Sequence, residues 1–419
     1  MVGAAVSDPA AKSTSTLAEA IKLAEELQVN LIEIASGVIT SPPIQINRDD
    51  LTIRSSGGNS EIRFVNGDSP TMQRVAMIDV GSNRLAIQNL HLSWNVRGTT
   101  IEGGTLFRIA SDNHMVRLAD STITVENLAE RDEIYAFEIE NQTFESPAAS
   151  AVATSAPLRV GDSVASSSAQ KLTSGESPTG PVKPGLETRK TLPMVAIELD
   201  NVSARGEMTL ISLVDAAQLQ FHWRNGLLAV SRRMLEATGA DVRPALGNNQ
   251  IQISLDKVTA WTPEGLVRVR LGQSRAYPML IDRKSNGSAF YYDPAANHIE
   301  FDGLESAVAD PGQLVQLRGD ENAYDFTASR DATVLLLGQW NRQVQKYGLP
   351  EILAPEKPSW ITDRSLPLQW VVRWAKPVPN TTPSRLTVGD FLQDGTIVPG
   401  FDKNRLPQFP IRPINEAEI

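Results

Sequence analysis

The feature that most constrains this chain is a recurring phrase in which a short apolar strand meets Asp or Asn and then resumes as apolar. The polar residues of the phrase fall at 89, 120, 200, 225 and 256, so the gaps between them are 31, 80, 25 and 31 residues. A period of this length with two or three short strands in each period predicts strand coils that stack into parallel sheets. Asp and Asn suit the corner of a coil because their side chains bond to nearby backbone and tolerate the left-handed conformation. The phrase appears as Ile87-Gln88-Asn89-Leu90, Leu118-Ala119-Asp120-Ser121, Leu199-Asp200-Asn201-Val202, Trp223-Arg224-Asn225-Gly226 and Leu255-Asp256-Lys257-Val258.

Strands dominate the expected secondary structure. Apolar runs of three to ten residues, separated by Gly, Asn, Asp and Ser, follow one another from residue 31 to residue 292, and this density predicts an all-β protein. One helix is expected over 17–27, where Leu17, Ile21 and Ala24 share a face, Thr16 is the N-cap and Glu19 completes a capping box. The runs include LIEI (31–34), VAMIDV (75–80), STITVEN (121–127), IYAFEIE (134–140), IQISL (251–255) and LVRVRL (266–271).

Three segments differ from the repeat. Residues 1–16 are expected to be a flexible N-terminus, followed by a repeat region over 17–340 with its capping helix at 17–28. Residues 145–192 are rich in Ser, Ala, Pro and Gly and predict a disordered loop inside the repeat region, because the strand phrase resumes beyond them. Residues 341–419 hold 11 of the 26 prolines. We expect them to form an extended tail that packs back on the repeats, and an exposed recognition arm is the alternative.

Composition excludes several classes of function. The chain has 39 Lys+Arg against 49 Asp+Glu, and this balance of −10 argues against a nucleic-acid partner or a broad affinity for anionic membranes. The absence of cysteine excludes disulfides and thiolate metal sites, and no apolar run is long enough to insert in a membrane. No secretory signal is visible in residues 1–16. The expected location is therefore cytoplasmic, or within a longer chain, with an extracellular location as the alternative that the fold suggests.

The order of these segments resembles a known architecture. A short helix, then LIEIASGVI, then PIQINRDDLTIRS, then stacked strand–Asn–strand phrases is similar to the opening of a right-handed parallel β-helix of the pectin-lyase-like type. The resemblance covers roughly 17–330. It implies an all-β fold: a single β-helix solenoid of about ten coils, an N-terminal capping helix and an irregular Pro/Trp-rich C-terminal tail.

A second resemblance involves the opening phrase and the segment PGFDKNRLP (399–407). Both are similar to regions of large bacterial multidomain proteins, some of which carry Ser/Thr protein kinase domains. This chain has no Gly-rich loop and no His-Arg-Asp, and Gly389-Asp390-Phe391 is not the Asp-Phe-Gly metal motif. No phosphoryl transfer is therefore expected.

Many β-helix proteins cleave acidic polysaccharides, so the motifs of that chemistry were sought. The hydrolase branch needs paired aspartates and a Gly-His-Gly. None of the four histidines has glycine on both sides, and the adjacent Asp49 and Asp50 are predicted to lie in a turn. The lyase branch uses a calcium cluster and an arginine base, but Asp120, Asp200 and Asp256 fit the structural corner better than a convergent calcium site. No zinc, phosphate or dinucleotide motif is present, so neither a metal nor a cofactor is expected. The histidines are His91, His114, His222 and His298.

One stretch is a candidate binding surface for an anionic sugar. In LVRVRLG, alternation turns Arg268 and Arg270 outward about 7 Å apart. Arginine can pair with a carboxylate while an aromatic ring stacks on the sugar, and a solvated face with cross-coil ion pairs is the competing interpretation. Trp261 is also predicted to point outward, where the tail would cover it or a sugar could stack on it, and Trp223 is expected in the core. The following strands are expected to add Arg275, Tyr277, Asp282, Arg283, Tyr291 and Tyr292 to this surface.

These observations predict a non-catalytic scaffold or binding module that presents a sheet face to a glycan or protein partner, as an accessory to a larger signalling or surface protein. The alternative is a divergent polysaccharide lyase or glycoside hydrolase with its site around Arg268, Arg270, Arg275 and Asp282. Three carboxylates, or Arg and Asp together, in a groove over one sheet would favour the enzyme. A flat face of mixed charge would favour the module.

Overall fold

The computed structural model describes residues 4–5, 13–58, 60–66, 73–97, 101–110, 114–140, 194–214, 217–241, 243, 250–293, 295–325, 333–348, 358–365, 372–395 and 398–410. The disordered loop predicted over 145–192 and most of the predicted N-terminal segment lie outside these residues. Within them the fold is predominantly β, with one α-helix, α1 (Leu17–Leu27). The strands form two long sheets that are almost entirely parallel.

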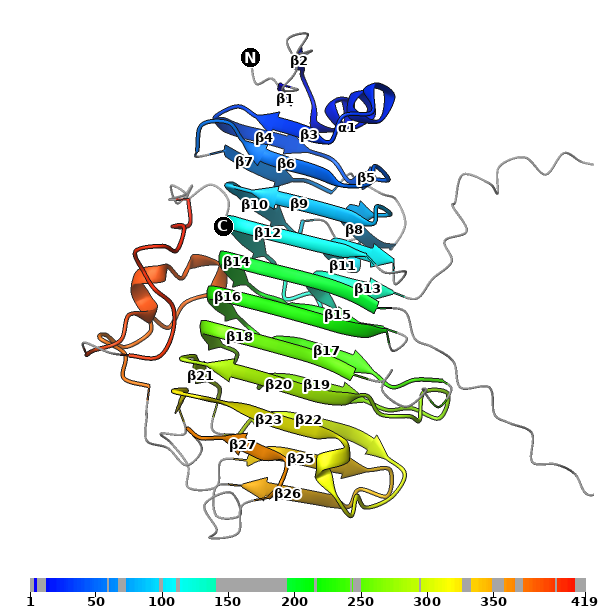
Figure 1. The fold of residues 1–419 in the computed structure, drawn as a ribbon, viewed down its shortest axis with the longest axis vertical. Helices are drawn as coiled ribbons and strands as arrows, with labels where there is room; N and C mark the ends of the chain where they lie inside the picture. Colours follow the sequence, from blue (N-terminus) through cyan, green and yellow to red (C-terminus); the bar gives the residue numbers. More distant parts are fainter. Residues whose placement is uncertain are drawn as a thin grey trace, which may run out of the picture.

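Sheet A contains 17 strands of the described ranges, and its long members run across the front of Figure 1. Its only antiparallel pairings are those of β1 with β2 and β3. Its strands are β1 (Ala4–Ala5), β2 (Ser13–Thr14), β3 (Leu31–Ile34), β4 (Gly37–Ser41), β6 (Leu51–Ser55), β7 (Ser60–Phe64), β9 (Arg84–Gln88), β10 (Leu90–Asn95), β12 (Met115–Glu126), β14 (Met194–Gly206), β16 (Gln218–Val230), β18 (Gln250–Trp261), β20 (Leu280–Asn286), β21 (Ala289–Tyr291), β23 (Val315–Asp320), β24 (Ala323–Asp325) and β27 (Ile361–Asp363).

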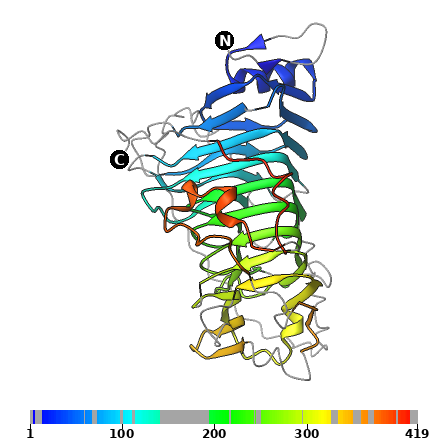
Figure 2. The ribbon, with the colours of Figure 1, turned by 90° about the vertical axis from the view of Figure 1, so that its left-hand side faces the viewer.

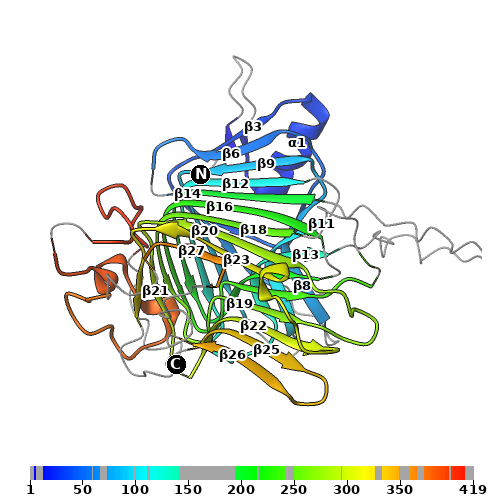
Figure 3. The ribbon, with the colours of Figure 1, turned by 60° about the horizontal axis from the view of Figure 1, so that its bottom comes forward.

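Sheet B contains ten strands of the described ranges and forms a separate layer, which Figure 3 shows together with sheet A. It ends at an antiparallel hairpin of β25 and β26. Its strands are β5 (Ile44–Ile46), β8 (Gln73–Val80), β11 (Ile101–Ala110), β13 (Ile134–Glu140), β15 (Thr209–Leu213), β17 (Leu235–Thr238), β19 (Val267–Arg270), β22 (Asn297–Leu304), β25 (Thr333–Gln339) and β26 (Val344–Gly348).

The chain visits the two sheets in turn. From β12 onward it passes to β13 in sheet B, returns to β14 in sheet A, and continues this alternation through β25. Each long strand pairs in parallel with its counterpart one cycle later, as β14 does with β16 and β16 with β18. This stacking is compatible with a β-helix.

The predicted corner phrase marks a real bend in the middle of sheet A. At this bend seven residues adopt positive φ between 48° and 55°, namely Asn89, Asp120, Asn201, Asn225, Lys257, Gly287 and Glu321. The prediction placed two of these corners one residue early, at Asp200 and Asp256, whose side chains instead point outward. The corner side chains form a ladder, because Asn225 Nδ2 donates to Asn201 Oδ1 at 3.0 Å and Asn201 Nδ2 donates to Asp120 Oδ1 at 2.9 Å.

The corner divides the outer surface of sheet A into two faces. We call the outward side chains before the corner, on β9, β12, β14, β16, β18, β20 and β23, the pre-corner face. Those after the corner, on β7, β10, β21, β24 and the second halves of the long strands, form the post-corner face. Inward side chains alternate with outward ones along each strand, and the inward ones fill the space between the sheets.

The interior is apolar and stacked from one strand to the next. Phe107 and Phe137, on neighbouring strands of sheet B, stack with ring centroids 5.0 Å apart. Trp223 is 1% exposed, in the core where the sequence predicts it. Helix α1 lies at the N-terminal end of the stack (Figure 1) and buries Leu17, Ala20, Ile21 and Ala24, so it shields apolar residues of the first strands. Its N-cap is Thr16, whose hydroxyl accepts from the Glu19 amide at 3.2 Å.

Residues 372–395 and 398–410, which we call the tail, lie along the post-corner face, as the orange and red segment of Figure 2 shows. They contain two 3₁₀ turns, η3 (Pro383–Arg385) and η4 (Val388–Phe391); a third, η2 (Pro311–Gln313), precedes β23. Polar contacts fix the tail, because the Asp402 amide donates to Asn225 Oδ1 at 2.6 Å and Ser203 Oγ donates to the Pro407 carbonyl at 3.2 Å. Its apolar side chains Leu386, Val388, Phe391, Leu406 and Phe409 cluster with Leu227 and Ala229 of β16.

No helix in the part of the chain that the structure describes is long and apolar enough to cross a membrane.

Candidate functional site

The residues predicted to form one sugar-binding surface are divided among three places. Arg268 and Arg270 lie on β19 in sheet B, and Arg275 and Tyr277 lie in the segment that follows it. Asp282 and Arg283 lie on β20 in sheet A. The aromatic residues Trp261, Tyr291 and Tyr292 lie at or beyond the ends of β18 and β21. The predicted arrangement of guanidinium groups beside aromatic rings therefore does not form.

The sheet B arginines are neutralised by carboxylates of the same sheet. Arg268 Nε lies 3.3 Å from Glu300 Oε1, and its Nη2 lies 3.0 Å from Asp302 Oδ2. Arg270 Nη2 lies 2.6 Å from Glu236 Oε1. Tyr277 is 40% exposed nearby and its backbone bridges to Ala240. This surface matches the competing interpretation of a solvated face with cross-strand ion pairs.

Arg283 points inward, not outward as predicted. Along β20 the inward positions are Ile281, Arg283 and Ser285, so the alternation places the guanidinium in the interior, where it is 0% exposed. Its Nη2 donates to Asp363 Oδ2 at 2.6 Å, which supplies the opposite charge. Arg283 Nη1 also lies 3.0 Å from His298 Nε2.

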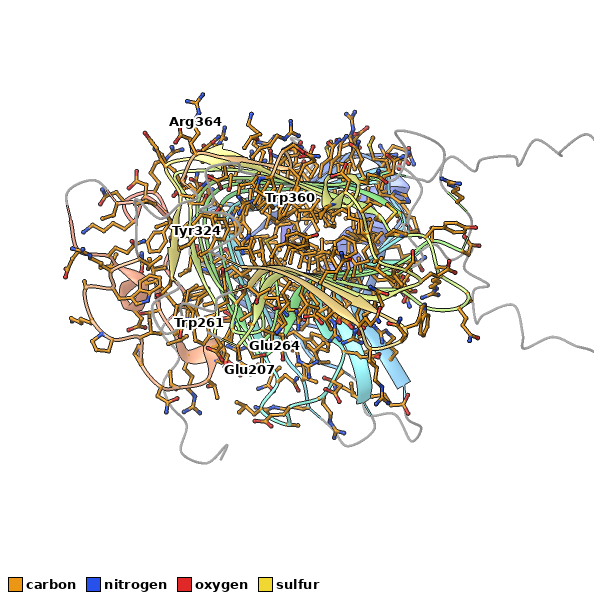
Figure 4. All side chains as sticks on the ribbon, turned by 90° about the horizontal axis from the view of Figure 1, so that it is seen from below. Glu207, Trp261, Glu264, Tyr324, Trp360 and Arg364 are labelled. Atoms are coloured by element: carbon orange, nitrogen blue, oxygen red, sulfur yellow. The ribbon has the colours of Figure 1, made fainter. Side chains whose placement is uncertain are left out.

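Further hydrogen bonds complete this buried network. Tyr324 Oη donates to Asp363 Oδ2 at 2.6 Å, and Asn322 Nδ2 donates to the same oxygen at 3.1 Å. Burial alone would raise the pKa of Asp363, but the Arg283 charge and the hydrogen bonds hold it below its ordinary value. Burial, with the Arg283 charge, lowers the pKa of His298 well below its usual range. Figure 4 shows Tyr324 and Trp360 between the strand layers, so we assign this network to the core and not to a binding surface.

The aromatic candidates are covered. Trp261 stacks on Tyr291 with ring centroids 5.9 Å apart and packs against Phe391 of the tail at 6.2 Å. Tyr292 is 3% exposed and belongs to the core. The tail therefore covers Trp261, one of the two arrangements that the sequence suggests for it.

A different part of the surface is hollowed. A hollow of about 490 Å³ lies on the pre-corner face over β12, β14, β16, β18 and β20. Strand pairing fixes its side chains in two rows across the sheet. The first row is Arg117, Glu198, His222, Ser254 and Lys284. The second row is Asp200, Arg224, Asp256 and Asn286.

Opposite charges alternate within the rows. Arg224 Nε donates to Asp200 Oδ1 at 3.0 Å, and a second nitrogen of the same guanidinium contacts Oδ2. This hydrogen bonding, with the Arg224 charge, lowers the pKa of Asp200 and raises that of Arg224. Arg117 lies 3.9 Å from Glu198. With three cations and three carboxylates, the hollow carries no net charge at neutral pH.

Three side chains in the first row of the hollow make no side-chain hydrogen bond or ion pair within the described ranges. They are His222, Ser254 and Lys284, which lie next to one another in the first row. His222 and Lys284 are exposed and Ser254 is half-buried. A cation, an imidazole and a hydroxyl without intramolecular partners can bind polar groups of another molecule.

The sequence interpretation missed this hollow because its residues occupy single outward positions and belong to no motif. A signal was nevertheless present. Each first-row residue stands three positions before a corner residue, as His222 stands before Asn225 and Ser254 before Lys257. Aligning the corner phrases would have placed these side chains in one row.

The outer face of sheet B carries a second charged cluster. Glu138 is 1% exposed and contacts Arg74, while Arg233 lies 3.4 Å from both Glu264 and Glu300. Burial lowers the pKa of Arg233. These groups compensate one another. Among the described residues, no group of His, Asp or Glu is arranged to hold a metal ion.

No protein-family model matches this chain, and neither the curated proteins nor the solved structures give a match.

Proposed function

We propose that the stacked strands form a right-handed parallel β-helix of about ten coils, similar to the pectin-lyase-like architecture. The regular passage of the chain between sheets A and B supports this fold. So do the left-handed corner residues, which recur about every 24 to 34 residues except across the segment that contains 145–192. Helix α1 at the N-terminal end of the stack agrees with the capping helix that the resemblance implies.

The function that the geometry supports best is that of a non-catalytic binding scaffold, whose pre-corner face contacts a glycan or protein partner. The observation that carries this proposal is the row of His222, Ser254 and Lys284, polar side chains without intramolecular partners in a hollow of about 490 Å³. The tail occupies the post-corner face, and the charges of sheet B pair with one another. The module would serve as an accessory to a larger signalling or surface protein.

A protein partner fits this face better than a glycan. The only aromatic residue that lines the hollow, Trp223, has its ring in the core, so no ring is offered for stacking on a sugar. The hollow is lined by charges of both signs, and electrostatic complementarity of this kind gives specificity in protein interfaces.

The enzyme alternative also has one observation in its favour. Glu198, Asp200, Asp256 and Arg224 line one hollow over one sheet, the combination expected of a carbohydrate-active site. The electrostatics oppose it. A general acid needs a raised pKa, but Arg224 lowers that of Asp200, and the raised pKa of Arg224 makes it a poorer base.

One experiment separates the candidates. The wild-type protein, the triple variant His222→Ala/Ser254→Ala/Lys284→Ala and the variant Arg268→Ala are compared on a glycan array, by cross-linking to protein partners, and by absorbance of unsaturated uronide from acidic polysaccharides. We expect binding that the triple variant loses and Arg268→Ala keeps, without uronide formation. Uronide release that depends on the hollow would establish the enzyme, and unchanged binding by the triple variant would remove the hollow from consideration.

A further inference from the structure

The charges of the pre-corner face are arranged so that the face complements itself. Consider a two-fold axis that lies in the plane of the face, parallel to the strands, between β16 and β18. It turns the stack end over end and sets β16 opposite β18, β14 opposite β20 and β12 opposite β23 of a second copy. Each row of the hollow then faces the same row in reverse order.

This operation brings opposite charges together. In the first row Glu198 faces the partner's Lys284, and in the second row Arg224 faces the partner's Asp256. Each pair occurs twice, as in any interface with two-fold symmetry. Lys284, which has no ion pair within the described ranges, gains one.

The polar side chains of the hollow also meet suitable groups. His222 faces the partner's Ser254, so an imidazole meets a hydroxyl, and Asp200 faces the partner's Asn286, so a carboxylate meets an amide. All four can form hydrogen bonds in this arrangement.

Like charges meet only at the outer strands of the face. Arg117 faces the partner's Arg318, but Arg117 lies 3.9 Å from Glu198 and Arg318 contacts Asp282 within its own chain. At the corner Asp120 faces the partner's Glu321. These positions are at the exposed rim, where charges are screened by solvent.

The area is sufficient for an interface. Six strands at about 4.8 Å and six residues at about 3.3 Å give a face of roughly 600 Å² in projection. Two copies bury roughly 1,200 Å², the lower limit for a specific protein interface. The expected association is therefore reversible and sensitive to salt.

We infer that the pre-corner face binds the same face of a second copy of this chain, giving an antiparallel two-fold dimer. This inference rests on the proposed function, because it names the protein partner of the same face. A glycan or a different protein in the hollow is the competing occupant.

The test is sedimentation velocity of the full chain across micromolar concentrations. Wild type is expected to show a monomer–dimer equilibrium that salt weakens. Lys284→Glu sets two carboxylates opposite each other, as Glu198→Lys sets two ammonium groups, so each variant should weaken the dimer at least about tenfold. The double variant Glu198→Lys/Lys284→Glu, and an equal mixture of the two single variants, should dimerise again because the charges are again complementary. Lys346→Glu, the same change at an exposed position on β26, should dimerise as wild type does.

Folding of each variant is checked by circular dichroism. A wild type that is monomeric at all concentrations would overturn the dimer. So would single variants that dimerise normally, or a double variant that does not recover. If wild type is monomeric but the hollow variants still lose a glycan or another protein, only the dimer is overturned and the proposed function stands.

Discussion

The buried pair of Arg283 and Asp363 gives the sharpest test of the energetics of this fold. Replacing Asp363 by Ala leaves the Arg283 guanidinium in the interior with no carboxylate, since both side chains are 0% exposed. It also removes the acceptor of the Tyr324 and Asn322 hydrogen bonds. Breaking a buried pair by removing one partner costs about 3–5 kcal/mol.

The assay is urea unfolding followed by tryptophan fluorescence. Trp360 is 2% exposed and directly precedes β27, which carries Asp363, so its emission reports on this end of the stack. With a denaturant slope of about 3 kcal/mol per molar urea, a loss of 3–5 kcal/mol lowers the midpoint by roughly 1–1.7 M.

A matched control lies on the neighbouring strand. Asp320 pairs with Arg364 at 3.8 Å, with side chains 54% and 83% exposed. Asp320→Ala should cost less than about 1 kcal/mol. The double variant Arg283→Met/Asp363→Leu should recover most of the stability, because no unpaired charge remains buried. If Asp363→Ala unfolds at the same urea concentration as Asp320→Ala, the reasoning about buried charge is refuted.

Three other outcomes are expected. Folding lowers the pKa of Asp363, so the contribution of this carboxylate to stability is complete above the ordinary pKa of 3.8. The contribution is lost as the pH falls below 3.8. In that pH range the urea midpoint of wild type should therefore drop more than the midpoint of Asp363→Asn. Gly226→Ala should destabilise the protein by about 2 kcal/mol or more in urea unfolding, because the added carbon overlaps Nε1 of the buried Trp223. Gly272→Ala is the control and should be near neutral, because nothing lies within 4 Å of its added carbon. Equal effects of the two substitutions would contradict this packing. Asn201→Ala should lower the free energy of unfolding by about 1–2 kcal/mol, because it removes two rungs of the corner ladder and its position has a φ of 52°. The control is Asn30→Ala, which removes only exposed hydrogen bonds from Arg48; a smaller loss for Asn201→Ala than for this control would argue against the ladder.

The strand content and the position of the bend were predictable because they depend on local chemistry. An apolar alternation specifies a strand, and Asn89, Asp120 and Asn225 tolerate the left-handed conformation that the corner needs. At Asn201 and Lys257 the prediction was one residue early. Asp and Asn are adjacent in the first case, and in the second a Lys, which carries no turn signal, takes the positive φ.

The candidate site was less predictable because it depends on contacts between distant residues. Arg283 looks like a surface residue in the sequence, and only Asp363, 80 positions later, allows it to lie in the interior. Arg268 and Arg270 were correctly expected to point outward, but their carboxylate partners lie on other strands: Glu236 on β17, and Glu300 and Asp302 on β22. The hollow of the pre-corner face requires the register of five strands, which no single segment encodes.

The tail has a consequence for how the molecule unfolds. In a stack of parallel strands each layer contacts only its neighbours, so unfolding can start at either end and proceed step by step. Here the tail contacts Arg205 on β14, Asn225 on β16, Thr259 on β18 and Ala323 on β24. The tail links strands that are not neighbours in the stack, so amide hydrogens from β14 to β24 should exchange as one cooperative unit. The strands next to α1, which the tail does not contact within the described residues, should exchange independently and sooner.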